Sequence, residues 1–183
     1  MNIKEIELKY ADLIKKAQDI MKDLDDPVHG IEHMRGVVEN TIILLNKQND
    51  ADKEVCILSA YWHDVGRKFG KGNHEVKSAE MLREELKKLN YDGDFIDKCY
   101  NAIYKHGEKT IPDTLEGIIV RDADKLDYFG IRRWNECIKR NVRLPRIFLG
   151  LKDKLLLLDY SKELYNTRVQ EWLDFLREIT LDK

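Results

Sequence analysis

Apolar residues recur along most of the chain at intervals of three and four positions, which is the spacing of one face of an α-helix. Near the N-terminus this pattern runs from Ile3 to Leu24, and it predicts a single amphipathic helix that ends close to residues 25–27. The stretch 52–64 is apolar on most sides and is expected to form the central helix. Further helices are expected at about residues 31–46, 76–89, 95–103, 114–123, 126–138 and 162–180.

Glycines interrupt the helical pattern between Val65 and Asn73, and they predict an exposed loop there. No segment alternates apolar and polar residues as a half-buried strand would, and the sequence has no internal repeat or low-complexity linker. A chain of 183 residues is long enough to bury a full core without disulfides or a structural metal. The sequence therefore predicts one all-α domain over residues 1–183.

Charge is nearly balanced, because 32 Lys and Arg residues stand against 34 Asp and Glu residues. This balance excludes a globally basic nucleic-acid-binding protein and an acidic-tail protein. One segment differs, since residues 139–154 hold six basic residues and one acid. It is interpreted either as a surface for phosphate or an anionic partner, or as a solvated loop around Pro145. A nucleic-acid partner is the less favoured alternative and predicts steep salt dependence.

The cysteines and the chain start both favour a cytoplasmic protein. Cys56, Cys99 and Cys137 are odd in number and lie in apolar periodic segments, which is typical of buried free thiols in a reducing compartment. The first residues carry acids where a signal peptide would have its apolar region. The longest apolar runs are far shorter than the roughly 20 residues of a membrane-spanning helix, so no membrane partner is expected.

The dipeptide His63-Asp64 is the first candidate for chemistry, because it ends an apolar helix in which neither side chain helps burial. At a helix end, an imidazole and a neighbouring carboxylate can converge on one cation. A buried carboxylate without a partner would be costly. The alternative interpretation is a His–Asp hydrogen bond that caps the turn at Gly66.

Two further segments carry similar groups. His29 and His33 stand four residues apart at the start of a helix, so they share one face. Three carboxylates, at Asp122, Asp124 and Asp127, follow an apolar run. Taken alone, the histidine pair is typical of a capping or surface feature, and acids in this position often cap the next helix.

Together the three segments supply two imidazoles and two carboxylates for one open metal site, from His33, His63, Asp64 and Asp124. Such a mixed nitrogen and oxygen set suits Mn²⁺, Fe²⁺, Co²⁺, Ni²⁺, Zn²⁺ or Mg²⁺. In an octahedral sphere it leaves two positions for water and a substrate oxygen. Hydrolysis is the expected chemistry, because a bound metal lowers the pKa of its water and neutralises phosphoryl charge.

With these motifs the sequence resembles the HD-domain metal-dependent phosphohydrolases, an all-helical superfamily. Its pattern is a His, then a His-Asp pair, then a later Asp, which His33, His63-Asp64 and Asp124 match in order. The resemblance covers a core of about residues 25–135. It implies a single-domain helical bundle of the HD type, with residues 136–183 packing as a cover.

The segments around His29, His74 and Asp124 look like those of small bacterial HD hydrolases, which include nucleotide pyrophosphohydrolases. The resemblance implies that Asp64 also touches the attacking water. In related enzymes the additional histidines either hold a second metal or face substrate phosphate, and phosphate contact is favoured here. The expected substrate-binding residues are His29, His74, His106, Lys125 and Arg67. Asp127 and Glu116 are expected to orient the histidine ligands.

The chain departs from some HD relatives directly after the pair. It continues Val65-Gly66-Arg67-Lys68, whereas relatives that act on alarmone pyrophosphates or deoxynucleoside monophosphates place a Glu shortly after the pair. This departure argues against those two activities and leaves the general base unassigned. The leading hypothesis is a metal-dependent phosphohydrolase that acts on a small phosphorylated molecule, best a nucleotide. The alternative is a non-catalytic module that binds a nucleotide or phosphate.

Overall fold

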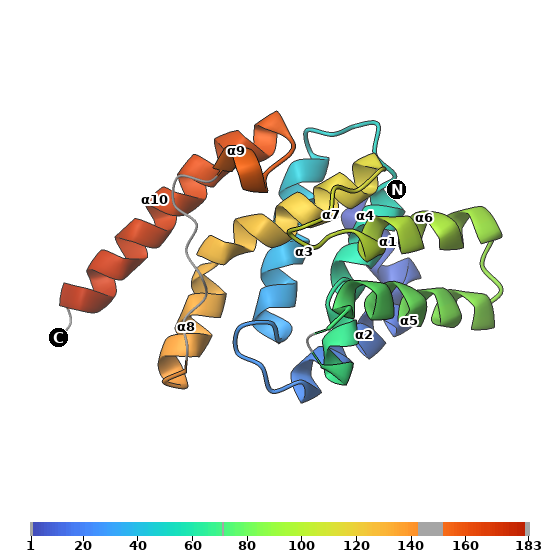
Figure 1. Ribbon diagram of the computed structural model, residues 1–183, viewed down its shortest axis with the longest axis horizontal. Helices are drawn as coiled ribbons and strands as arrows, with labels where there is room; N and C mark the ends of the chain where they lie inside the picture. The colour runs from blue at the N-terminus through green and yellow to red at the C-terminus, as the bar shows by residue number, and fades with distance from the viewer. Residues whose placement is uncertain (1, 71, 143–151, 182–183) are drawn as a thin grey trace.

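The computed structural model describes residues 2–70, 72–142 and 152–181, and over these residues it is helical without a β-strand, which confirms the all-α prediction (Figure 1). The α-helices are α1 (Ile3–Lys9), α2 (Ala11–Asp23), α3 (Ile31–Leu45), α4 (Lys53–Trp62), α5 (His74–Lys88), α6 (Gly93–Tyr104), α7 (Leu115–Leu126), α8 (Ile131–Lys139), α9 (Lys152–Leu155) and α10 (Asp159–Leu181). Two short 3-10 helices, η1 (Val65–Phe69) and η2 (Asp127–Phe129), follow α4 and α7.

Helix α4 is the centre of the bundle, as expected from its apolar sequence. Its residues from Val55 to Trp62 are all buried, and it packs against α3, α6 and α7. The side chain of Asp52 begins the helix by accepting hydrogen bonds from the backbone N–H groups of Glu54 and Val55. Because α4 runs through the core, the His63-Asp64 pair at its end lies inside the protein.

Helices α1, α2, α3, α5, α6 and α7 pack against α4. Helices α5 and α6 lie side by side as a hairpin, and α3 packs along α7 (Figure 1). The C-terminal helix α10 packs against α7 and η2, where the Trp172 ring meets those of Trp134 and Phe129 at centroid distances of 5.1 and 5.8 Å. The aromatic contacts therefore attach the C-terminal region to the bundle.

The N-terminal prediction of one helix is wrong, because the chain breaks at Tyr10 between α1 and α2. The Tyr10 backbone leaves helical geometry, with φ −107° and ψ 20°. Its ring is buried, stacks on Phe95 at 5.8 Å, and donates a hydrogen bond to Glu54. These tertiary contacts outweigh the local helix preference, which the apolar spacing alone had indicated.

The predicted exposed loop at residues 65–73 is also wrong in part. Residues Val65 and Gly66 are fully buried within η1. An added Cβ at Gly66 would lie 2.4 Å from the carbonyl oxygen of His74, so the glycine allows α5 to approach closely. The backbone N–H of Gly66 donates to the Ser78 hydroxyl at 2.8 Å, which fixes the start of α5 against the end of α4.

The acidic segment 122–127 does not separate two helices as expected. Helix α7 begins at its N-cap Thr114 and continues to Leu126, so Asp122 and Asp124 lie in its last turns. Asp122 is fully buried and accepts hydrogen bonds from the backbone N–H groups of Leu157 and Leu158 at 2.9–3.1 Å. This carboxylate anchors the turn that leads into α10.

Three further expectations concern the whole chain. Cys56, Cys99 and Cys137 are buried and free, as predicted. Among the described residues, no helix has the combination of length and apolarity that crossing a membrane requires. Most of the basic segment 139–154 lies outside the described residues, so its predicted roles stay predictions.

Candidate metal centre

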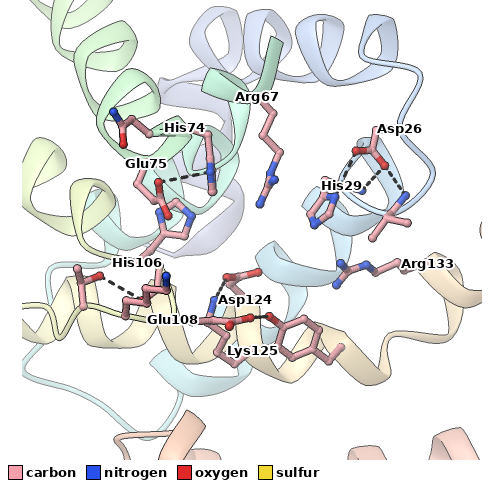
Figure 2. A pocket seen from close by; sticks show the side chains of 16 residues that line it. Asp26, His29, Arg67, His74, Glu75, His106, Glu108, Asp124, Lys125 and Arg133 are labelled. Carbon is pink, nitrogen blue, oxygen red and sulfur yellow. Dashed lines mark hydrogen bonds and ion pairs between the residues drawn. The ribbon is translucent and has the colours of Figure 1, made fainter. Parts of the chain in front are cut away.

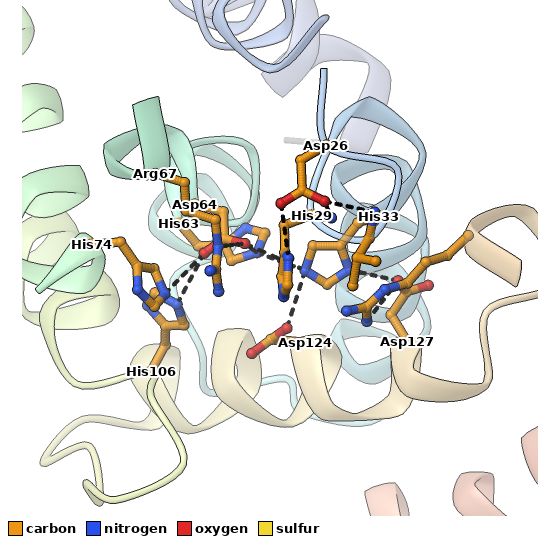
Figure 3. Close-up of polar contacts among 12 residues, drawn as sticks. Asp26, His29, His33, His63, Asp64, Arg67, His74, His106, Asp124 and Asp127 are labelled. Atoms are coloured by element: carbon orange, nitrogen blue, oxygen red, sulfur yellow. Dashed lines mark hydrogen bonds and ion pairs between the residues drawn. The ribbon is translucent and has the colours of Figure 1, made fainter. Parts of the chain in front are cut away.

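The histidines of the chain form one continuous row inside the bundle (Figure 3). They come from different elements: the loop before α3, α3 itself, the end of α4, the start of α5 and the end of α6. Ring centroids of neighbouring members lie 5.2–5.9 Å apart, each pair edge to face. In order, the row is His29, His33, His63, His106 and His74.

One group in this row gathers His33, His63 and Asp64, and Asp124 adjoins this group at His33. Nε2 of His33 lies 3.3 Å from Nε2 of His63 and 3.2 Å from Oδ1 of Asp124. Oδ2 of Asp64 lies 3.7 Å from His33 Nε2 and 3.8 Å from His63 Nε2. Ligand atoms that share one ion at bonds of about 2.0–2.2 Å stand roughly 3 Å apart, so these spacings fit a cation.

The second group uses the other oxygen of Asp64. Its Oδ1 lies 3.2 Å from Nε2 of His74 and 3.6 Å from Nε2 of His106. This Oδ1 is buried and accepts no hydrogen bond from the described residues. The three residues can thus hold a cation of their own, as an alternative to the predicted contact with phosphate.

Hydrogen bonds at the far side of the rings fix their orientation. Nδ1 of His63 donates to the carbonyl oxygen of Ala60 at 2.8 Å, and Nδ1 of His106 donates to that of Ile103 at 2.7 Å. Because a carbonyl oxygen only accepts, the proton is on Nδ1 and each Nε2 presents a lone pair. The donor set therefore fits a metal ion by its chemistry as well as by its spacing.

His33 is held in the same way by a carboxylate. Its Nδ1 lies 2.6 Å from Oδ2 of Asp127, which is itself buried. The predicted role of Asp127 agrees with this position. Glu116 does not lie there: it accepts a hydrogen bond from the backbone N–H of Asp52 at 2.9 Å. Eight residues separate it from Asp124 along α7, roughly 12 Å at about 1.5 Å per residue, so its predicted contact with a histidine is wrong.

The electrostatic environment favours the metal-binding forms of His63, Asp64 and Asp124, whereas the pKa of His33 is raised, against burial, by Asp124 and Asp127. Burial lowers the pKa of His63 to about 3, so the ring is neutral at physiological pH. Burial alone would raise the pKa of Asp64, but His63, His106, His74 and Arg67 together hold it well below its usual range. Lys125 and His33 do the same for the pKa of Asp124, again against burial. Both carboxylates are therefore ionised.

A cavity of about 660 Å³ opens over the row (Figure 2). The structure brings all five predicted substrate-binding side chains to its wall: His29, Arg67, His74, His106 and Lys125. Two of them also contact the metal-binding carboxylates: Arg67 Nε lies 2.5 Å from Oδ2 of Asp64, and Lys125 Nζ lies 2.6 Å from Oδ2 of Asp124. These cations neutralise the carboxylates and face the cavity at the same time.

The loop at His29 is held by Asp26. Oδ1 of Asp26 accepts hydrogen bonds from the backbone N–H groups of Val28 and His29 at 2.8 and 3.1 Å. Its Oδ2 lies 3.2 Å from the His29 ring. Burial lowers the pKa of His29 in spite of this carboxylate, so the ring enters the cavity uncharged.

Other residues of the cavity wall were missed from the sequence, above all Arg133, Tyr128 and Lys109. Arg133 follows η2 in an amphipathic segment where an arginine is ordinarily a surface residue. Its burial arises from the close packing of α8 on α3, which apolar spacing does not reveal. Lys109 lies in the turn after α6, where loop residues carry no periodic signal.

Comparison with known proteins gives one family and several solved structures, including the two that follow. The family model described as HD domain matches residues 30–128. A predicted HD superfamily hydrolase from an uncultured Thermotogales bacterium is similar at 22% identity and a TM-score of 0.74, over 100% of this chain and 99% of that one. Bacillus subtilis YpgQ in complex with ADP is similar at 21% identity and a TM-score of 0.64, over 97% of both chains. No curated protein sequence matches.

Proposed function

Because the chain belongs to the HD-domain family, we propose that it is a metal-dependent phosphohydrolase that cleaves a phosphoester or phosphoanhydride bond, with a nucleotide as substrate. The observation that carries this proposal is the position of Asp64. Its two carboxylate oxygens face two separate groups of imidazole nitrogens, in a buried cluster at the base of an open cavity. A cluster of this kind serves little structural purpose, since burying it is costly without a cation.

His33, His63, Asp64 and Asp124 hold the divalent ion in this proposal. Their nitrogen and oxygen donors suit Mn²⁺, Fe²⁺, Co²⁺, Ni²⁺, Zn²⁺ or Mg²⁺. When bound, such an ion acidifies water and neutralises charge on a phosphoryl oxygen. Asp64 is the catalytic residue: its Oδ1, which accepts no hydrogen bond from the described residues, is positioned to accept one from the attacking water.

The remaining residues of the row and the cavity act on the substrate. Charge grows on phosphoryl oxygens during transfer, and fixed donors around the cavity stabilise it. The donors are His29, His74, Lys125 and Arg67, and His106, also predicted to bind the substrate, would donate only in its protonated form. His74 and His106 have a second possible role, since with Asp64 they form a group that can hold another cation. The metal content per chain decides between the two roles.

A nucleotide is supported as substrate by two observations. The cavity of about 660 Å³ has the volume typical of small-molecule sites. A solved structure of the same fold, YpgQ, was determined in complex with ADP. A cytoplasmic location is proposed as well, because three buried free thiols suit a reducing compartment.

The test combines metal analysis with turnover. Purified protein is assayed for metal content and then for phosphate and pyrophosphate release from nucleoside mono-, di- and triphosphates with added Mn²⁺. H63A and D64A should abolish product release and lose metal. D94A, which removes an exposed carboxylate on α6, is the matched control and should behave as wild type. Full activity of metal-free D64A would contradict the proposal.

The competing hypothesis is a module that binds a nucleotide or phosphate without turnover. It is the less favoured one, because all four ligand residues are present, with His33, His63 and Asp64 close together and Asp124 beside His33. Thermal shift with ADP distinguishes it when measured beside the turnover assay. A large shift with ADP, together with no product from any substrate in the panel, would favour the module.

A further inference from the structure

Arg133 is a buried cation that the metal cluster does not use. It lies in the first turn of α8 and is 2% exposed. A guanidinium carries five N–H donors and stays charged, so burial without acceptors is costly. In this case Nε and Nη1 are buried and donate to no acceptor among the described residues. Buried donors left in this state call for a ligand that supplies the acceptors.

The described residues around Arg133 attract its guanidinium but do not accept hydrogen bonds from its buried N–H groups. Its Nη1 lies 3.9 Å from Oδ2 of Asp127, beyond hydrogen-bond distance, and that oxygen is already engaged by His33 at 2.6 Å. The guanidinium carbon stands 5.6 Å from the centroid of the Tyr128 ring. The side chain is thus attracted by one carboxylate and one aromatic ring, while its donors remain available.

The guanidinium is aimed into the cavity over the metal cluster. Figure 2 shows it entering from the α8 side, with His29 above it and Asp124 to its left, while Arg67 enters from η1 on another side. An anion in this cavity would therefore meet an arginine on each of two sides.

We propose that Arg133 is a principal phosphate-binding side chain of this site, donating its unpaired N–H groups to non-bridging phosphoryl oxygens. A planar guanidinium matches two such oxygens at once, and the cavity wall excludes water from its inner side. Asp127 positions both His33 and Arg133, so the metal ligand and the anion receptor share one carboxylate. The inference rests on the proposed function, because it takes the substrate to be phosphorylated.

The test measures binding of methylenediphosphonate, a diphosphate analogue that cannot be hydrolysed, by isothermal titration calorimetry. Wild type, R133M and R133K are compared at equal metal content. Affinity should fall roughly 10- to 100-fold in R133M, the range expected for a lost charge-assisted hydrogen bond. R133K keeps the positive charge but lacks the planar pair of N–H donors of a guanidinium, so its affinity should fall about 10-fold. R132M is the matched control, because Arg132 is a neighbouring exposed arginine paired with Glu39.

The outcomes separate this inference from the enzyme proposal. If R133M does not fold, R133K decides, and an affinity within twofold of wild type overturns the role of Arg133. An equal loss in R132M also overturns it. If the variants lose binding but wild type turns over no substrate, the phosphate-binding role of Arg133 is upheld and the enzyme proposal fails. If wild type turns over substrate and R133K leaves KM unchanged, the enzyme proposal stands and the role of Arg133 is rejected.

Discussion

Asp127 holds Nδ1 of His33 at 2.6 Å, and so directs Nε2 of the same ring toward the centre of the cluster. On the opposite edge, that Nε2 lies 3.2 Å from Oδ1 of Asp124. In the proposed site, the Asp127 carboxylate would act on a bound metal ion through the histidine that it orients.

Replacing Asp127 with Asn should weaken metal binding without unfolding the protein. The Asn amide keeps the size of the carboxylate but loses the charge that strengthens the bond to His33. Loss of such an orienting partner costs about 10- to 100-fold in metal affinity. Calorimetric titration of Mn²⁺ into apo protein measures the metal affinity, and circular dichroism checks that the variant is folded. An affinity equal to wild type would show that His33 keeps its orientation unaided.

Gly36→Ala should also weaken metal binding, although Gly36 is not itself a ligand residue. A Cβ at Gly36 would lie 1.9 Å from Oδ1 of Asp127, so the carboxylate has to move. We expect reduced metal affinity and a loss of about 1–3 kcal/mol in the free energy of unfolding, the usual range for overpacking. Gly93→Ala is the matched control, because nothing lies within 4 Å of its added Cβ. Equal behaviour of the two variants would refute the steric explanation.

Asp122→Asn should lower stability while leaving metal content unchanged. The Asn NH₂ group would face backbone N–H groups of Leu157 and Leu158, leaving buried donors unsatisfied. The expected loss is about 1–3 kcal/mol in the free energy of unfolding by urea. A drop in bound metal without a drop in stability would reverse the assignments of Asp122 and Asp124.

Asp26→Asn should lower the free energy of unfolding at neutral pH but not in acid, where the wild-type carboxylate is protonated. Hydrogen bonds to His29 and to two backbone N–H groups outweigh burial and depress the pKa of Asp26 in the folded state. The carboxylate therefore stabilises the fold above its ordinary pKa of about 3.8, and that contribution is lost as pH falls below it. The difference in unfolding free energy between wild type and D26N, expected to be about 1 kcal/mol at pH 7, should shrink toward pH 3. A constant difference across this range would contradict the assignment.

Removing the metal should destabilise the wild-type protein. Without a metal ion, the ionised carboxylates of Asp64 and Asp124 stay buried next to the histidines of the cluster. A ligand present at 100 times its Kd contributes about 2.7 kcal/mol. A chelator should therefore lower Tm, and Mn²⁺ should restore it. D124A should show a much smaller response; an equal response would place the ion elsewhere.

The helices that could be predicted from the sequence are those whose apolar face meets the core directly. The periodicity at residues 31–46 and 162–180 corresponds to α3 and α10, and the apolar stretch 52–64 to α4. The break at Tyr10 could not be predicted, because it depends on Phe95 and Glu54, far away in the sequence. Tertiary contacts of this kind leave no local pattern.

Some residues of the candidate site could likewise be predicted from the sequence, and others could not. His33, His63, Asp64 and Asp124 are visible in the sequence, because polar groups in apolar surroundings need a reason. The sharing of Asp64 between two groups of imidazoles depends on how α4, α5 and α6 meet, and on which ring nitrogen faces inward. Arg133 was missed because only the packed structure shows that its donors are buried and unpaired.

The acids near the end of α7 also limit how the length of the chain can vary. Asp122 binds the turn before α10, Asp124 faces the metal cluster and Asp127 holds His33. One residue inserted between Asp122 and Asp124 would rotate one relative to the other by about 100°, so the two contacts could not form together. Insertions and deletions should therefore be excluded from this stretch.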